Sequence, residues 1–325
     1  MMIRPRRNRR NEVIRSMVRE NILTPHDLIA PLFVIEGKSS RIAINSMPGQ
    51  SRLSVDELVK ECRELYALGV KCVSLFPAIE DNLKTADARE AYNPQGLNAR
   101  AIRAVKEALP DMLVMADIAL DPYSSDGHDG IVDTKTGEIL NDVTLEILAK
   151  QAICEANAGA DIVGPSDMMD GRVGFIRKAL DQNSHHNALI MSYTAKYASG
   201  YYGPFREALD SAPKKGDKKT YQMDPANGRE ALREAALDEA EGADILMVKP
   251  GLPYLDVIYR LRQATNLPIA AYNVSGEYAM IKAASERGWI DNDKVILETL
   301  LSFKRAGADT ILTYFAKEAA MLLGK

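Results

Sequence analysis

Residues 241–251 read Glu-Gly-Ala-Asp-Ile-Leu-Met-Val-Lys-Pro-Gly, so a glycine, a short apolar run and one lysine follow one another closely. Glycine commonly ends a helix in the left-handed conformation, and an apolar run bounded by turn signals is typical of a strand buried on both faces. Pro250 cannot donate a hydrogen bond to a neighbouring strand, so the strand should end at Lys249. The stretch predicts an amine at the carboxyl end of a buried strand.

A second stretch, residues 188–196, has the same form and ends in Lys196. If the two strands are neighbours, they lie about 4.8 Å apart and their lysine side chains can approach each other. Burial and a nearby positive charge both lower the pKa of an ammonium group, and the free amine is the species that forms a Schiff base. The pair therefore predicts carbonyl chemistry, whereas one lysine alone would more simply be one that extends to solvent.

The helix-ending motif recurs, and each copy follows a helical pattern and precedes an apolar run. The copies are Leu68-Gly69-Val70, Ala158-Gly159-Ala160-Asp161, Glu241-Gly242-Ala243-Asp244 and Ala306-Gly307-Ala308-Asp309. Eight apolar runs are predicted strands, at residues 28–34, 72–77, 114–120, 162–165, 189–194, 245–248, 269–274 and 310–315. Amphipathic stretches predict helices near residues 55–67, 98–107, 142–158, 170–182, 226–241, 254–264, 277–305 and 316–323, with a break at Gly288.

This alternation predicts an α/β fold, a (β/α)8 TIM barrel with parallel strands and right-handed crossovers. A doubly wound open sheet is the alternative, but no Gly-x-Gly-x-x-Gly motif follows the first predicted strand. We expect a basic N-terminal arm at residues 1–25, which makes subunit contacts, and a catalytic barrel domain at residues 26–325.

The composition is that of an ordinary globular protein, with 325 residues, 46% hydrophobic and 26% charged. No stretch approaches the roughly 18 apolar residues of a membrane span, and no signal-peptide core follows the N-terminal arginines. We therefore expect a cytoplasmic protein with no membrane partner. The three cysteines are far apart, which predicts neither a disulfide framework nor a zinc-thiolate site.

Positive charge is concentrated in residues 1–20, which contain seven arginines and only two acidic residues, Glu12 and Glu20, for a net charge of +5. Because the whole chain carries −4, the remainder carries −9. Such an arm is compatible with nucleic-acid binding or targeting, but no aromatic side chain is interleaved for stacking on bases. We expect the arm to dock on an acidic neighbouring subunit, with no nucleic acid as partner.

Carboxylates are concentrated after the third predicted strand, where Asp117, Asp121, Asp126 and Asp129 accompany His128. Oxygen ligands suit magnesium, and the lack of thiols argues against zinc. Local turns built by aspartate side chains are the alternative interpretation. We expect Asp117, which is nearest the strand, to act on or orient substrate rather than bind a metal.

A long excursion at residues 197–225 follows the fifth predicted strand, and segments of this length are usually functional lids or disordered. It contains an aromatic pair, Tyr201-Tyr202, and the cationic side chains Arg206, Lys214, Lys215, Lys218 and Lys219. We expect it to close over an anionic ligand, with a solvated loop as the alternative.

Four longer motifs carry a resemblance to a known family. They are Pro165-Ser-Asp-Met-Met-Asp-Gly-Arg172, Met191-Ser-Tyr-Thr-Ala-Lys196-Tyr-Ala-Ser, Tyr202-Gly-Pro-Phe-Arg206 and Met247-Val-Lys249-Pro-Gly-Leu-Pro-Tyr-Leu-Asp256. Together with the arm and the ending Thr313-Tyr314-Phe-Ala-Lys, they resemble porphobilinogen synthase, also called δ-aminolevulinic acid dehydratase, over nearly the whole chain. The resemblance implies a lyase of tetrapyrrole (heme) biosynthesis that condenses two 5-aminolevulinate molecules into porphobilinogen with loss of two waters.

The resemblance also implies roles for particular residues. Lys249 would form the Schiff base with the substrate that supplies the propionate side chain, and Lys196 would bind the substrate that supplies the acetate side chain and aminomethyl group. The carboxylate-binding positions correspond to Arg206, Lys218 and Gln222 for one substrate, and to Ser275 and Tyr314 for the other. Lys218 replaces an arginine found in some relatives, so it offers a point charge rather than a planar fork. Tyr272 is expected to pack beside bound substrate.

The expected metal use differs from that of the zinc-using members of the family. Those members carry three cysteines after the third strand, where this chain has Ala119, Asp121 and Asp129, so no catalytic zinc is expected. The pattern resembles the magnesium-responsive branch, whose allosteric Mg²⁺ lies near a subunit interface at a glutamate corresponding to Glu234. Without that resemblance, Glu234 would be read as an exposed helical acid. The arm resembles the segment that embraces a neighbouring barrel in a homo-octamer.

Two other functions are compatible with parts of the sequence. A class I aldolase would also use a barrel-strand lysine, but its phosphate cradle needs glycine-rich loops after strands seven and eight, and these segments contain one glycine in total. An RNA-binding protein that used the arginine arm would leave the paired lysines unexplained.

Overall fold

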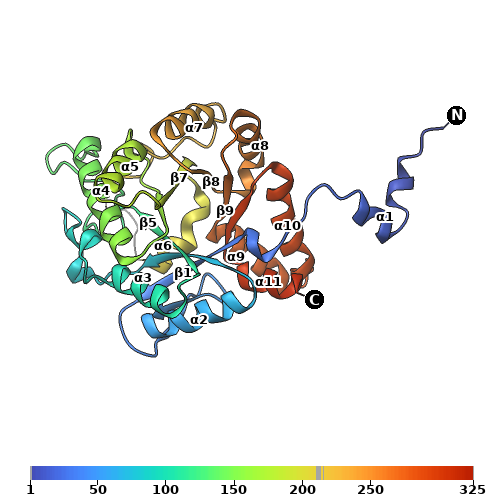
Figure 1. The fold of residues 1–325 in the computed structure, drawn as a ribbon, viewed down its shortest axis with the longest axis horizontal. Helices are drawn as coiled ribbons and strands as arrows, with labels where there is room; N and C mark the ends of the chain where they lie inside the picture. Colours follow the sequence, from blue (N-terminus) through green and yellow to red (C-terminus); the bar gives the residue numbers. More distant parts are fainter. Residues whose placement is uncertain (1, 210–213, 215, 325) are drawn as a thin grey trace.

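Eight parallel strands close into a barrel in the part of the chain that the computed structural model describes, residues 2–209, 214 and 216–324. Each strand pairs with the next along the chain, and the last pairs with the first. These strands are β1 (Leu28–Ile35), β4 (Cys72–Pro77), β5 (Leu113–Ile118), β6 (Ile162–Pro165), β7 (Leu189–Lys196), β8 (Ile245–Lys249), β9 (Ile269–Asn273) and β10 (Thr310–Thr313). The predicted (β/α)8 barrel is confirmed (Figure 1).

Helices surround the barrel and connect successive strands (Figure 1). They include α2 (Val55–Ala67), α3 (Leu97–Ala108), α4 (Asn141–Ala158), α5 (Arg172–Gln182), α7 (Glu230–Glu241), α8 (Leu255–Ala264), α9 (Ser275–Glu286), α10 (Asn292–Ala306) and α11 (Ala316–Leu323). Gly159, Gly242 and Gly307 each follow a helix with φ between 100° and 114°, so the recurring glycine motif ends helices as predicted.

The strands are apolar because both faces are covered, by side chains inside the barrel and by helices outside it. Every residue of β4 and of β9 is buried. Predicted strand boundaries agree to within two residues, and the predicted helix at 226–241 begins four residues later, at Glu230. Against this apolar background, the lysines that end β7 and β8 are exceptional.

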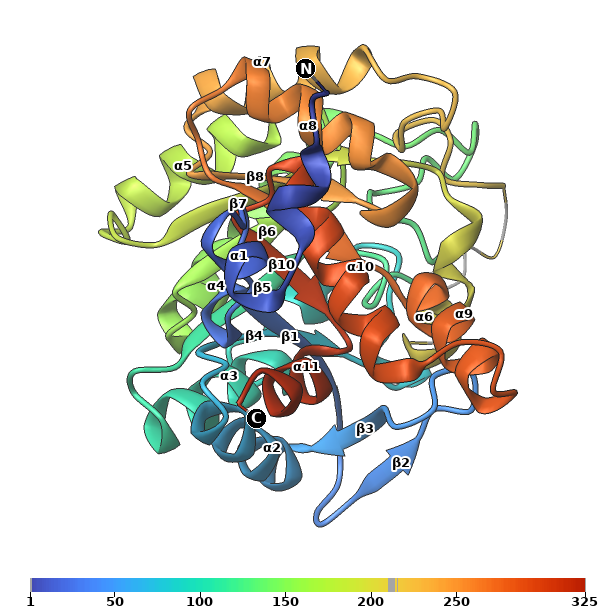
Figure 2. The ribbon, with the colours of Figure 1, turned by 90° about the vertical axis from the view of Figure 1, so that its right-hand side faces the viewer.

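Two short strands that the sequence did not predict extend the sheet beyond the barrel (Figure 2). β3 (Ser51–Ser54) pairs in parallel with β1, and β2 (Arg41–Ala43) pairs in antiparallel fashion with β3. All three residues of β2 are exposed, so no buried apolar run marks this strand in the sequence.

The arm, residues 2–24, projects from the barrel and contains η1 (Pro5–Arg9) and α1 (Glu12–Met17) (Figure 1). No residue of these two elements is buried. Apolar side chains of the arm are exposed at Met2, Ile3, Val13, Met17, Val18 and Ile22. The barrel begins at η2 (Pro25–Asp27). Among the helices that the structure describes, none has the length and apolar character needed to cross a bilayer.

Candidate active site

The two lysines predicted to act together end adjacent strands, Lys196 on β7 and Lys249 on β8, and they are direct register partners. Both are buried, with 5% and 6% of their surface exposed. The carboxyl ends of the strands are the face at which barrel enzymes place their active sites. The structure therefore brings these two amines together where chemistry is expected.

A register irregularity in β7 adds a tyrosine to this face. Ser192 pairs with Leu246 and Ala195 with Val248, so β7 contains one more residue than β8 over the same distance. This extra residue lets Tyr193 and Lys196, three positions apart, both face the interior. Strict alternation from Lys196 would have turned Tyr193 outward, so its place inside the barrel is not evident from the sequence.

Aromatic rings surround the Lys249 amine. Its Nζ lies 4.6 Å from the ring centroid of Tyr272, 5.0 Å from that of Phe205, 5.1 Å from that of Tyr193 and 5.3 Å from that of Tyr202. Burial, and after it the positive charge of Lys196, lower the pKa of Lys249 to about 7. A substantial fraction of Lys249 is therefore free amine at neutral pH.

The aspartates after β5 have two different environments. Burial raises the pKa of Asp117 to about 6, although the charges of Lys249 and Lys196 act against this rise. Burial also opposes ionisation of Asp129, but Lys196 and Lys218 outweigh it and lower the Asp129 pKa. Asp117 can thus exchange a proton near neutral pH, while Asp129 stays charged.

The same aspartates hold Lys218 in a buried ion cluster. Lys218 Nζ lies 3.0 Å from Asp129 Oδ2 and 3.1 Å from Asp121 Oδ2, and Lys196 Nζ lies 3.6 Å from Asp129 Oδ1. Ammonium groups therefore engage the carboxylate oxygens that a hard cation would use. In the described part of the chain, no group of three or more His, Cys, Asp or Glu side chains is placed to hold a metal ion.

The excursion after β7 contains η5 (Gly200–Tyr202) and α6 (Gly203–Leu209). The start of α9 supports it, because Ser275 Oγ accepts a hydrogen bond from Phe205 N at 3.0 Å. Gly276 approaches so closely that a Cβ there would lie 2.5 Å from Tyr201 O. Tyr202 and Phe205 thereby reach the Lys249 amine. Lys215 lies outside the described residues.

The predicted carboxylate-binding residues are placed unequally. Lys218, Gln222, Ser275, Tyr272 and Tyr314 are buried. The Tyr272 and Tyr314 hydroxyls lie 3.0 Å apart, and Tyr272 also contacts the Lys249 amine. Arg206 is exposed on α6, so the structure does not bring it to the lysines. Glu234 lies half-buried on α7, outside the barrel, and is not the exposed acid that its helical context suggested.

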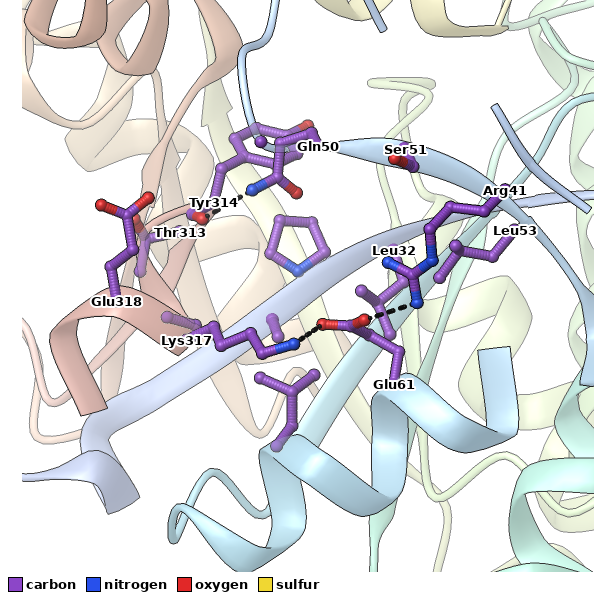
Figure 3. Close-up of a pocket in the computed structure, with 15 residues that line it drawn as sticks. Leu32, Arg41, Gln50, Ser51, Leu53, Glu61, Thr313, Tyr314, Lys317 and Glu318 are labelled. Atoms are coloured by element: carbon purple, nitrogen blue, oxygen red, sulfur yellow. Dashed lines mark hydrogen bonds and ion pairs between the residues drawn. The ribbon is translucent and has the colours of Figure 1, made fainter. Parts of the chain in front are cut away.

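A separate cavity of about 140 Å³ lies behind Tyr314, between β1, α2 and α11 (Figure 3). Glu61 pairs there with Arg41 at 2.9 Å and with Lys317 at 2.7 Å. Gln50 Nε2 donates to the backbone oxygen of Tyr314 at 3.0 Å and so helps to fix that residue from behind. Neither Lys196 nor Lys249 lines this cavity, and we place the chemistry at the barrel mouth.

A buried amine with a pKa near neutrality, next to a second lysine at the mouth of a closed barrel, defines an enzyme that forms a Schiff base with a carbonyl substrate. Residues 2–322 match the sequence model of the family described as delta-aminolevulinic acid dehydratase. The chain therefore belongs to the delta-aminolevulinic acid dehydratase family of lyases.

Individual relatives agree with this membership. A chloroplastic delta-aminolevulinic acid dehydratase from Physcomitrium patens is 58% identical, over 99% of this chain and 74% of the relative. The enzyme from Synechocystis sp. is 56% identical, over 99% of this chain and 98% of the relative. The structure of delta-aminolevulinic acid dehydratase (porphobilinogen synthase) from Toxoplasma gondii ME49, in complex with the reaction product porphobilinogen, matches with a TM-score of 0.97 and 57% identity, over 99% of this chain and 91% of that one. The predicted family and enzyme class are confirmed.

The pKa of Lys249 predicts how Schiff-base formation depends on pH. Because only the free amine reacts, the rate at which borohydride traps a carbonyl substrate at Lys249 should rise as the pH increases through about 7 and then level off. Lys196→Met removes the neighbouring positive charge, so the midpoint should move to higher pH. Peptide mapping of the reduced adduct at each pH measures both profiles. The exposed Lys294→Met is the matched control, and an unchanged midpoint in Lys196→Met would contradict the charge coupling.

Proposed function

We propose that this chain condenses two molecules of 5-aminolevulinate into porphobilinogen, with loss of two waters, through Schiff bases on Lys249 and Lys196. The observation that carries this assignment is the register pairing of the two buried lysines, one of which has a pKa of about 7. Two such positions side by side can hold two ketone-bearing substrates for condensation, and family membership identifies the substrate.

The free amine of Lys249 attacks the ketone of the substrate that supplies the propionate side chain, and water leaves as the imine forms. Lys196 binds the substrate that supplies the acetate side chain and the aminomethyl group, also through a Schiff base. Asp117 experiences the charges of both lysines and has a pKa of about 6, so it is suited to accept and return the protons that these steps release. Aromatic rings around Lys249 exclude water that would hydrolyse the imine.

Substrate carboxylates are held, in this proposal, by two separate groups of side chains. Lys218 and Gln222 lie where the excursion returns to the barrel, and the backbone amide of Gln222 donates to Lys218 O at 2.9 Å. Tyr314 and Ser275 follow β10 and β9. Arg206 would contact substrate only after its exposed side chain turns toward the barrel mouth.

A lysine replacement tests this function. Lys249→Met keeps the volume of the apolar stem, so it should fold, yet porphobilinogen formation should fall below about one-thousandth of the wild-type rate because no imine can form. Colorimetric detection of the pyrrole and circular dichroism measure the two properties. Lys294→Met should retain full activity. If wild-type enzyme forms no pyrrole from 5-aminolevulinate, or if its reduced adduct maps to neither Lys249 nor Lys196, the proposal is wrong.

We also propose that the chain is a member of the magnesium-responsive branch without catalytic zinc. The groove of about 400 Å³ around Glu234 is lined by the acidic side chains of Asp170, Asp238 and Glu241, together with Arg172 and Arg233. Burial raises the pKa of Glu234, and the charges of Asp238, Asp170 and Glu230 add to this rise, whereas Arg172 opposes it. A magnesium ion typically binds one or two carboxylates and keeps several waters, so Glu234 fits as a ligand. A cation there would relieve the repulsion among these acids.

The magnesium proposal predicts a response that depends on Glu234. Added Mg²⁺ should raise the activity several-fold, and Glu234→Gln should lose this increase while keeping the basal rate, because the carboxylate that binds the ion is gone. A zinc-selective chelator should leave the activity of wild-type enzyme largely intact. Glu298→Gln, at an exposed position of α10, is the matched control. Tightly bound zinc required for turnover would refute the assignment.

We propose a homo-octamer in which the arm embraces a neighbouring barrel, and a cytoplasmic location, although several relatives are named chloroplastic. The projecting arm supports this assembly, because its exposed apolar side chains would be costly to leave in water. Its charge of +5 also complements the acidic remainder of the chain.

Removal of the arm should therefore reduce the size of the assembly. Deleting residues 2–20 takes away both the apolar and the cationic contacts, so the mass measured by light scattering should fall and the activity should decrease. Replacing Arg4, Arg6 and Arg7 together by lysine keeps the charge and should keep the mass. An unchanged mass after the deletion would count against a contact made by the arm.

A further inference from the structure

A buried carboxyl group lies behind the strand ends that carry the site. Glu277 is the third residue of α9 and has none of its surface exposed. Its Oε1 accepts a hydrogen bond from Leu252 N at 3.2 Å, and its Oε2 accepts one from Asn273 Nδ2 at 2.5 Å. Leu252 lies three residues after Lys249, so Glu277 holds the turn that leaves the reactive lysine.

The hydrogen bonds continue to the next strands. Asn273, the last residue of β9, accepts a hydrogen bond at Oδ1 from the Thr313 hydroxyl at 2.8 Å. Thr313 ends β10 and immediately precedes Tyr314. Gly251 N donates to Tyr272 O at 2.7 Å, which ties the same turn to β9 a second time. Glu277 thus joins the ends of three adjacent strands, and each end adjoins a residue of the proposed site.

The Lys249 amine depends on this backbone support. Its Nζ lies over four aromatic rings, and such contacts are less directional than a hydrogen bond. Its backbone oxygen is held by Tyr197 N at 2.9 Å and by the Tyr202 hydroxyl at 3.2 Å. The turn itself has no spare room, since a Cβ at Gly251 would lie 2.6 Å from a Phe303 ring carbon.

We infer that Glu277 is a positioning residue for the reaction: by clamping the turn after Lys249 to Asn273 and, through it, to Thr313, it holds the reactive amine against Tyr272. This inference rests on the proposed function, because it assigns Glu277 a role in the Schiff-base step. Glu277 acts on Lys249 indirectly, through the backbone amide of Leu252 and the side chain of Asn273.

The clamp depends on the direction of each hydrogen bond. Burial raises the pKa of Glu277 to about 8, so the trapping rates are compared above that pH, where Glu277 is a carboxylate. There, Glu277→Gln keeps nearly the same shape but turns one acceptor into a donor, which then faces either the Leu252 amide or the Asn273 side-chain amide. Adding Asn273→Asp replaces the side-chain amide that donates to Glu277 by a carboxylate that accepts a hydrogen bond. In the double variant the new glutamine can donate to the new aspartate and accept from Leu252, while the aspartate still accepts from Thr313. Donors and acceptors are again matched, and the net charge is unchanged.

The test measures Lys249 itself in the full-length enzyme. Reductive methylation with formaldehyde and cyanoborohydride, followed by peptide mapping, gives the pH midpoint of the Lys249 amine without using the substrate. Borohydride trapping of 5-aminolevulinate gives the rate of the Schiff-base step. Circular dichroism and the thermal midpoint show whether each variant is folded.

We expect Glu277→Gln to slow trapping by about tenfold or more, since small misplacements of a reacting group are costly. Its methylation midpoint should move to higher pH as the amine leaves its aromatic surroundings. Glu277→Gln with Asn273→Asp should restore the trapping rate to within about threefold of wild type. It should also restore the methylation midpoint to within a few tenths of a pH unit. A general loss of stability would lower the folded fraction without moving the midpoint.

Two outcomes overturn the inference. One is a folded Glu277→Gln enzyme with wild-type trapping and midpoint. The other is a double variant that stays below about one-tenth of the wild-type trapping rate, whether it is folded or not. Failure of the proposed function appears differently, because wild-type Lys249 would then be methylated normally but would trap no 5-aminolevulinate.

Discussion

A lysine amine can stay unprotonated near neutral pH only where its charged form is poorly solvated, and this requirement accounts for the surroundings of Lys249. Closed strands leave it no path to solvent through the barrel wall, and rings from three different segments cover it from above and beside. The adjacent Lys196 adds a repulsion that water would otherwise screen. The surrounding aromatic rings, the strand register and the second lysine therefore all favour an unprotonated Lys249 amine that is shielded from water.

The same low-dielectric region separates the two carboxyl groups that matter most. Asp117 and Asp129 come from one segment, yet their pKa values move in opposite directions. Asp129 is flanked by two ammonium groups and serves as their fixed counter-charge, whereas Asp117 has weaker compensation and can change its protonation state. The two aspartates thus differ in role because their surroundings differ: Asp117 can carry a proton, and Asp129 stays an anion. Without Asp129, Lys196 and Lys218 would be uncompensated charges in an apolar interior, which is a costly arrangement.

The sequence predicted the barrel because each strand is a buried apolar run and four of the helices that precede strands end in a glycine, two local signals that tertiary contacts reinforce. It predicted the paired lysines because both end such runs. The outlying strand β2 escaped notice since its residues are all exposed. The inward position of Tyr193 could not be predicted because it depends on the extra residue in β7. The hydrogen bonds of Glu277 could not be predicted because its partners, Asn273 and Leu252, lie 4 and 25 positions away. Hydrogen-bond networks across strand ends leave no periodic pattern in a sequence.

The irregularity in β7 also constrains how this enzyme can vary. Tyr193 and Lys196 share the interior only because one additional residue lies between Ser192 and Ala195. Loss of a single residue from this segment would restore regular alternation, and either the tyrosine or the lysine would then point into the helical layer. Substitutions in the segment can be absorbed by local repacking, but a change in its length cannot. We therefore expect the number of residues between the strand start and the lysine to stay constant among functional relatives.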